Sequence, residues 1–177
     1  MSWTLCSGLI VDDVPTEPND KELITTVRLE LTPQGGGIAS TATLTDLDGP
    51  GGIDAIITDL TLATGTTYDY SVTFLNEAAN PAEDITEEVR EEDEEHQVFY
   101  IVENGLDATV TYGDSDGDGA PIGLVGTLTT SATASSGALR VVLRHEPVKD
   151  ANGVADGDIT NASGETDVEA SFPTTVQ

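Results

Sequence analysis

Short runs in which apolar and polar residues alternate recur from residue 23 onwards, separated by segments rich in glycine, aspartate and asparagine. In the clearest run, Leu23–Thr32, alternation places Val27, Leu29 and Leu31 on one apolar face of a β-strand. Eight further runs follow, at residues 38–45, 56–62, 67–75, 97–102, 108–112, 122–130, 137–144 and 166–176. This spacing predicts an all-β fold, an immunoglobulin-like antiparallel β-sandwich, in which runs 23–32 and 38–45 pair with each other.

One segment departs from the alternating pattern. Residues 81–96, PAEDITEEVREEDEEH, are rich in helix-forming residues, and Ile85 and Val89 fall on one helix face at i, i+4. Nine of the residues from 83 to 95 are acidic, and like charges at this density destabilise a helix unless they are screened. We therefore expect one short acidic helix resting on an edge or end of the sandwich, with its charges in solvent.

Acidic residues greatly outnumber basic ones, 33 against 6, which gives a formal net charge of -27. Such self-repulsion strains a compact state unless salt screens it, and the Debye length falls to about 3 Å at 1 M. Hydrophobic residues make up 37% of the chain and fall into regular runs, which argues against a disordered acidic tail or a calcium sponge. The charge predicts a folded, halophilic protein and excludes binding to nucleic acid through phosphate contacts.

A length of 177 residues suits a single domain with one core. Residues 1–21 mix acids, prolines and small residues, so we expect a flexible acidic tether there and one β-sandwich domain over 22–177. No run approaches the roughly 18 apolar residues that a membrane-spanning helix needs. The one cysteine, Cys6, can form no disulfide within the chain.

Several motifs after residue 21 resemble a family of small lipoproteins from Bacteroidota, often labelled type 1 periplasmic binding fold proteins. The motifs are ELITTV (22–27), FLNEAANPAEDITEEV (74–89), EEHQVFY (94–100), VTYGDSDGDGAPIG (110–123), LRVVLRHEPVK (139–149) and GDITNASGETDVEASF (157–172). A true periplasmic binding fold would need alternating βαβ units and about twice this length. We therefore keep the β-sandwich prediction over that label.

The resemblance implies a place in the cell envelope, periplasmic or surface-exposed, with a lipidated cysteine ahead of an acidic tether. Cys6 stands at the matching position, although residues 2–5 do not form a small-residue lipobox and the apolar signal region is missing. An incidental thiol is the alternative for Cys6. The resemblance also suggests a role as accessory to an outer-membrane uptake receptor, with a small ligand or that receptor as partner.

The segment Asp114–Gly119, DSDGDG, alternates carboxylates with small residues, as the first half of a calcium loop does. Asp114, Asp116 and Asp118 are therefore calcium-ligand candidates. Against this, position twelve of an EF-hand pattern is Val125 and not glutamate, and a hairpin turn of this composition is common without an ion.

Two histidines, His96 and His145, are a second candidate site. We expect His96 to end the acidic helix and His145 to end a strand. If their strands are neighbours, the imidazoles meet at one end of the sandwich with Glu92, Glu95 or Glu146. Two histidines and a carboxylate suit zinc or another transition metal, and two histidines can hold a haem iron. The alternative is that His96 only interacts favourably with the helix dipole.

No nucleophile elbow, phosphate loop or interpretable Ser/His/Asp set occurs, so we expect no enzyme. The sequence predicts a noncatalytic envelope protein that binds a metal ion or small ligand, with calcium as the first cofactor candidate and zinc or haem behind it. The alternative is a structural or adhesive module with a calcium-stiffened loop. A binder should have convergent polar groups near the histidines, whereas a structural module should have an exposed apolar patch or edge strand.

Overall fold

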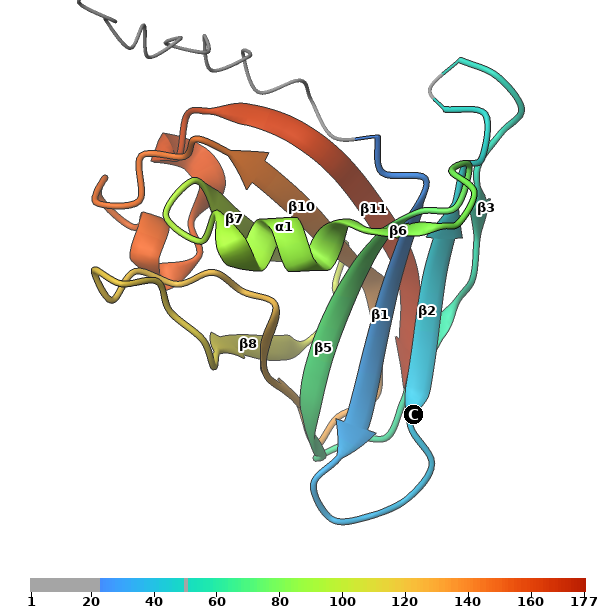
Figure 1. Ribbon diagram of the computed structural model, residues 1–177. Coiled ribbons are helices and arrows are strands. Elements are labelled where there is room, and N and C mark those ends of the chain that lie inside the picture. Colours follow the sequence, from blue (N-terminus) through green and yellow to red (C-terminus); the bar gives the residue numbers. More distant parts are fainter. Residues whose placement is uncertain (1–22, 50) are drawn as a thin grey trace, which may run out of the picture.

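The computed structural model describes residues 23–49 and 51–177, and two β-sheets pack face to face in it (Figure 1). The first sheet contains β1 (Thr26–Pro33), β2 (Ser40–Thr45), β3 (Ile56–Ile57), β5 (Thr67–Asn76), β6 (Glu83–Asp84), β8 (Ala108–Tyr112) and β9 (Val125–Thr130). The second contains β4 (Leu60–Leu62), β7 (His96–Glu103), β10 (Ser135–His145) and β11 (Glu165–Val176). The prediction of an all-β sandwich with one short acidic helix is confirmed. Cys6 and the predicted tether over 1–21 lie outside the described residues.

Alternation along the strands builds the core between the sheets. The first sheet has the order β3-β2-β1-β5-β9-β8, with β6 beside β5, and the second has the order β4-β11-β10-β7. In β1, Val27, Leu29 and Leu31 are buried, whereas Arg28 and Glu30 are exposed. β1 and β2 pair antiparallel, as predicted. Each fully buried aliphatic or aromatic side chain contributes about 1.5–3 kcal/mol, so the predicted alternation accounts for the layered architecture.

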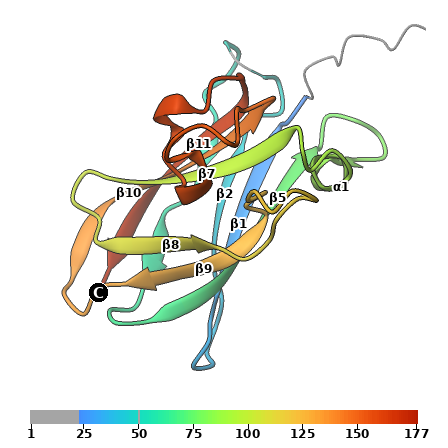
Figure 2. The same cartoon turned by 90° about the vertical axis from the view of Figure 1, so that its left-hand side faces the viewer.

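Part of the second sheet, around Phe99 and Val142, is buried on both faces. Phe99 of β7 and Val142 of β10 point away from the main core and pack with Val154 and Ala162. These two residues belong to the segment that forms the 3-10 helices η1 (Val154–Asp156) and η2 (Ile159–Asn161), which lies beside β7 in Figure 2. The cover packs against β7 and β10, which are the strands that carry the two histidines.

The run at residues 56–62 is two strands and not the single strand that alternation predicts. β3 pairs with β2 in the first sheet, whereas β4 pairs with β11 in the second. Ile56 and Ile57 are exposed, and Leu60 and Leu62 are buried, because the chain crosses from one sheet to the other between them. β4 runs parallel to β11, whereas the other strand pairs of the sandwich are antiparallel, as predicted.

The helix α1 (Ile85–Glu91) is shorter than the predicted segment 81–96 and lies beside β5 (Figure 1). The side chain of Asp84 accepts a hydrogen bond from the backbone N–H of Thr86 and fixes the start of the helix. Ile85 and Val89 are buried, as predicted. A turn follows the helix, and His96 is the first residue of β7, so the expectation that His96 ends the helix is wrong.

Thr86 attaches the helix to the sheet. Its hydroxyl accepts a hydrogen bond from Phe74 N–H at 3.0 Å and lies 3.2 Å from the Phe74 carbonyl oxygen, to which it donates. We predict that Thr86→Val lowers the free energy of unfolding by about 1–3 kcal/mol, because both buried backbone groups lose their partner. Denaturant unfolding measures this, with Thr86→Ser as the control that keeps the hydroxyl. Equal stability of the two variants would contradict the prediction.

Candidate histidine and aspartate site

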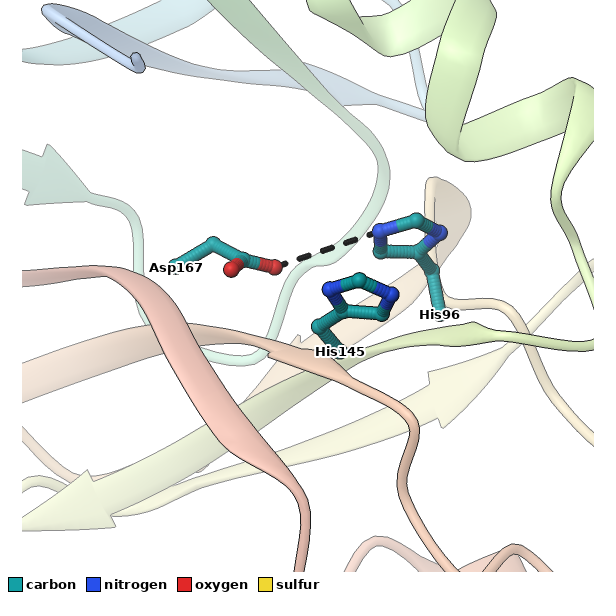
Figure 3. Close-up of side chains that lie close together, drawn as sticks. All are labelled: His96, His145 and Asp167. Atoms are coloured by element: carbon teal, nitrogen blue, oxygen red, sulfur yellow. Dashed lines mark ion pairs between the residues drawn. The ribbon is translucent and has the colours of Figure 1, made fainter. Parts of the chain in front are cut away.

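His96 and His145 lie directly opposite each other at one end of the second sheet. His96 begins β7, His145 ends β10, and the two are register partners in the antiparallel pair. Alternation places them on the same face as Val98 and Leu143, which are buried in the main core. The imidazole rings are stacked, with centroids 4.8 Å apart and an interplanar angle of 17° (Figure 3). The two strands are neighbours, which is the condition on which the expected meeting of the imidazoles depended.

A third side chain, Asp167, completes the cluster and was not predicted. β10 pairs Leu143 with Val168 but Arg144 with Thr166, so Asp167 is the extra residue of a β-bulge in β11. Regular alternation from Val168 to Val176 would turn Asp167 toward the outer face. The bulge instead directs its carboxylate toward His96, as Figure 3 shows.

The hydrogen bond on one side of His96 determines which ring nitrogen faces Asp167. Nδ1 lies 3.2 Å from the backbone carbonyl oxygen of Glu92, and because a carbonyl only accepts, Nδ1 carries a hydrogen. In the neutral ring the lone pair is therefore on Nε2, 3.9 Å from Oδ2 of Asp167. Both side chains are only 3% exposed. A lone pair and a carboxylate that face each other away from water form a donor pair suited to a metal cation.

The donor set is one that a transition metal accepts. The ligand atoms of His96, His145 and Asp167 all lie within 4.8 Å of one another. Two ligands of a tetrahedral zinc ion are about 3.3–3.6 Å apart, given bonds of about 2.0–2.2 Å. The lone pairs lie in the ring planes, so nearly parallel rings cannot both point at one ion, and one imidazole must rotate for all three to coordinate it. Two histidines and one carboxylate then leave a fourth position for water or a ligand.

A second group of potential ligands adjoins the first and shares His145 with it. Glu95, His145 and Glu146 also bring their ligand atoms within 4.8 Å of one another. Nε2 of His145 is 3.8 Å from Oε2 of Glu95. Glu95 and Glu146 were predicted as neighbours of the histidines, and the structure places both there. Both glutamates are exposed, in contrast to His96 and Asp167.

The predicted calcium turn uses its carboxylates for contacts within the protein. Asp114 accepts hydrogen bonds from the backbone N–H groups of Gly123 and Leu124 at 2.8 and 2.9 Å. Oδ1 of Asp116 accepts from two further backbone N–H groups, and its Oδ2 lies 2.8 Å from Nζ of Lys149. Among the described residues, Asp114, Asp116 and Asp118 are not grouped as convergent metal ligands. The Lys149 ammonium lies against the carboxylate that an ion would use, so calcium binding here remains a prediction that this geometry does not favour.

Tyrosines near the core have structural roles. The hydroxyl of Tyr100 donates to the backbone carbonyl of Gly123, and that of Tyr112 donates to Val98. Burial raises the pKa of the Tyr112 phenol to about 12, a rise that the nearby Asp114 charge reinforces. Burial also raises the pKa of Tyr100 far above its ordinary value. Both phenols therefore stay protonated and act as hydrogen-bond donors.

Comparison with protein-family models, with curated proteins and with solved structures finds no match to this chain. Within residues 23–49 and 51–177, no helix has the length and apolar character required to cross a bilayer.

Proposed function

We propose that the protein is a noncatalytic metal-binding protein that takes up a divalent transition metal, best matched by zinc, on His96, His145 and Asp167. The observation that carries this proposal is the bulge in β11, which turns Asp167 toward His96. A bulge interrupts the ladder of a long strand, and bulges occur often where a side chain must be redirected to a site. The hydrogen bond from His96 to the Glu92 carbonyl supplies the outer contact that zinc-binding histidines usually have.

The site favours zinc over haem and over calcium. Haem would need its two imidazoles on opposite faces of the macrocycle, whereas these rings are stacked with centroids only 4.8 Å apart and leave no room for it. Calcium prefers six to eight oxygen ligands, whereas two of the three donors here are imidazoles. In concentrated salt, sodium competes for exposed carboxylates, so buried nitrogen donors also give the protein selectivity for a softer ion.

We also propose a cellular location and a binding partner for the protein. The charge of -27 supports a halophilic protein in a salt-rich medium. The resemblance to Bacteroidota lipoproteins supports an envelope location, with Cys6 as the lipid-anchor candidate. Capture of a metal ion or small ligand for an outer-membrane uptake receptor is then the role that combines these features.

Thermal unfolding in 2 M KCl with EDTA, calcium or zinc tests the site. A ligand that binds only the folded state adds about 2.7 kcal/mol at a hundredfold excess over its dissociation constant, which raises the melting temperature by about 5–11 °C. We predict this rise with zinc, its loss in His96→Ala and Asp167→Asn, and its retention in the control Glu88→Gln, which removes one exposed charge from α1 as Asp167→Asn removes one from the site. An unchanged melting temperature in zinc would reject the proposal.

One observation favours the structural or adhesive module as a second candidate. Ile53, in the loop before β3, and Ile56, in the edge strand β3 of the first sheet, are 80% and 71% exposed. Exposed apolar groups on a sheet edge form contacts between copies once salt screens the charge repulsion. Sedimentation velocity in 2 M KCl tests this candidate: association that Ile53→Ser/Ile56→Ser abolishes supports it, and a monomeric wild type rejects it.

A further inference from the structure

We infer that Glu95, His145 and Glu146 form an outer station at which a metal ion first binds, before it moves to the buried ligands His96 and Asp167. This inference rests on the proposed function and describes how an ion reaches that site. The outer station is exposed and the inner site is closed, and His145 belongs to both.

Exposure falls stepwise along this path. The side chain of Glu95 is 55% exposed and that of His145 is 14% exposed. The side chains of His96 and Asp167 are 3% exposed. A hydrated ion from solvent therefore meets the two glutamates first. His145, which lies beside Glu95, is also a ligand candidate of the inner site and so connects the two groups.

The backbone holds the outer station in place. The N–H of Glu146 donates to the carbonyl oxygen of Glu95 at 2.7 Å, which ties the end of β10 to the turn before β7. Glu146 has a φ of 51°, in the left-handed region that non-glycine residues rarely adopt. A Cβ at Gly164 would lie 2.3 Å from the His145 carbonyl oxygen, so only glycine fits beside this turn. The fold thus fixes the backbone from which the side chains of Glu95 and Glu146 extend.

The chemistry of the ligands favours movement of the ion from the outer station to the inner site. Carboxylates hold a hydrated divalent ion weakly in water, whereas imidazole nitrogens bind zinc more tightly. His145 can release Glu95 and turn toward Asp167 by rotating its ring, the same rotation that coordination by both imidazoles requires. Each step exchanges water or carboxylate for a ring nitrogen on the ion and involves no covalent or redox change.

Stopped-flow mixing of zinc with the full chain in 2 M KCl, with a fluorescent zinc chelator as competitor, tests the inference. The variant is Glu95→Gln/Glu146→Gln. We expect its association and dissociation rate constants both to fall about tenfold or more, because a transit site lies on the path in both directions. The control Glu88→Gln/Glu91→Gln removes the same charge from α1 and should retain wild-type rates, since long-range steering is screened at this salt concentration.

Three results would overturn the inference. Equal slowing in both double variants would mean that general surface charge steers the ion. Wild-type rates in Glu95→Gln/Glu146→Gln would mean that the ion enters elsewhere. Loss of equilibrium zinc binding in that variant, with binding retained in Asp167→Asn, would make the outer group the resident site. Failure of the proposed function is distinguished from all three, because the wild type itself would then bind no zinc.

Discussion

Replacing Lys149 with methionine is expected to lower the free energy of unfolding by about 3–5 kcal/mol, the usual result of removing one partner from a buried ion pair. Nζ of Lys149 lies 2.8 Å from Oδ2 of Asp116, and the two side chains are 9% and 2% exposed. The same ammonium donates to the backbone carbonyl of Asp93. Methionine keeps the length of the side chain but leaves the Asp116 carboxylate buried with no cation. Denaturant unfolding in 2 M KCl measures the difference in free energy of unfolding between Lys149→Met and the wild type.

A double-mutant cycle separates the ion pair from packing. In Asp116→Asn the side-chain oxygen can still accept the N–H groups of Asp118 and Ala120, which Oδ1 accepts in the wild type. We therefore expect Lys149→Met/Asp116→Asn to be more stable than Lys149→Met alone, because the unpaired charge is gone. Purely additive losses would show that Lys149 acts through its bond to the Asp93 carbonyl and not through Asp116.

The same pair predicts a pH dependence. Burial opposes ionisation of Asp116, but the hydrogen bond from Lys149 and those from two backbone N–H groups outweigh it, so the pKa of this carboxyl lies below its ordinary value. A depressed folded-state pKa contributes stability above the unfolded-state value of about 3.9, and that contribution is lost as the pH falls toward the folded-state pKa. The stability difference between wild type and Lys149→Met should therefore narrow below about pH 4. A constant difference from pH 7 to pH 3 would contradict this assignment.

The fold and half of the candidate site could be predicted because they depend on short-range pattern. Alternation identified the strands and placed each histidine at the end of a run, whereas the pairing of β7 with β10, on which the meeting of the two imidazoles depended, was only a condition of the prediction. Local pattern also identified Ile85 and Val89 as the buried face of the helix. It did not fix the end of that helix, because the acidic residues after Glu91 are compatible with both a helix and a turn.

What could not be predicted depends on contacts between distant segments. Alternation in β11 assigns Asp167 to the outer face, and only the pairing with β10 shows that one extra residue reverses it. The acidic turn presented its carboxylates as ion ligands in the sequence, but their partners include Lys149, 33 positions away from Asp116. The run 56–62 likewise looked uniform, because sequence pattern does not show that two sheets share it.

Raising KCl from 0.1 M to 2 M is expected to raise the melting temperature by several degrees. Two unit charges 10 Å apart in water repel by about 0.4 kcal/mol, which 0.1 M salt reduces only about threefold and salt at 1 M or above almost removes. Summed over a net charge of -27, this screening raises the free energy of unfolding by on the order of a few kcal/mol. Each kcal/mol raises the melting temperature by about 2–4 °C in a chain of this size.

Charge location distinguishes this screening from a general effect of salt on hydrophobic contacts. The variant Glu88→Gln/Glu91→Gln lacks two exposed charges of α1, so its melting temperature should rise less with KCl than that of the wild type. An equal rise in both proteins would mean that KCl acts by strengthening the burial of apolar surface. A wild type equally stable at both salt concentrations would reject halophilic adaptation. Salt that screens the surface leaves buried charges largely unscreened, which supports the buried side chains of His96 and Asp167 as the proposed recognition groups in this medium.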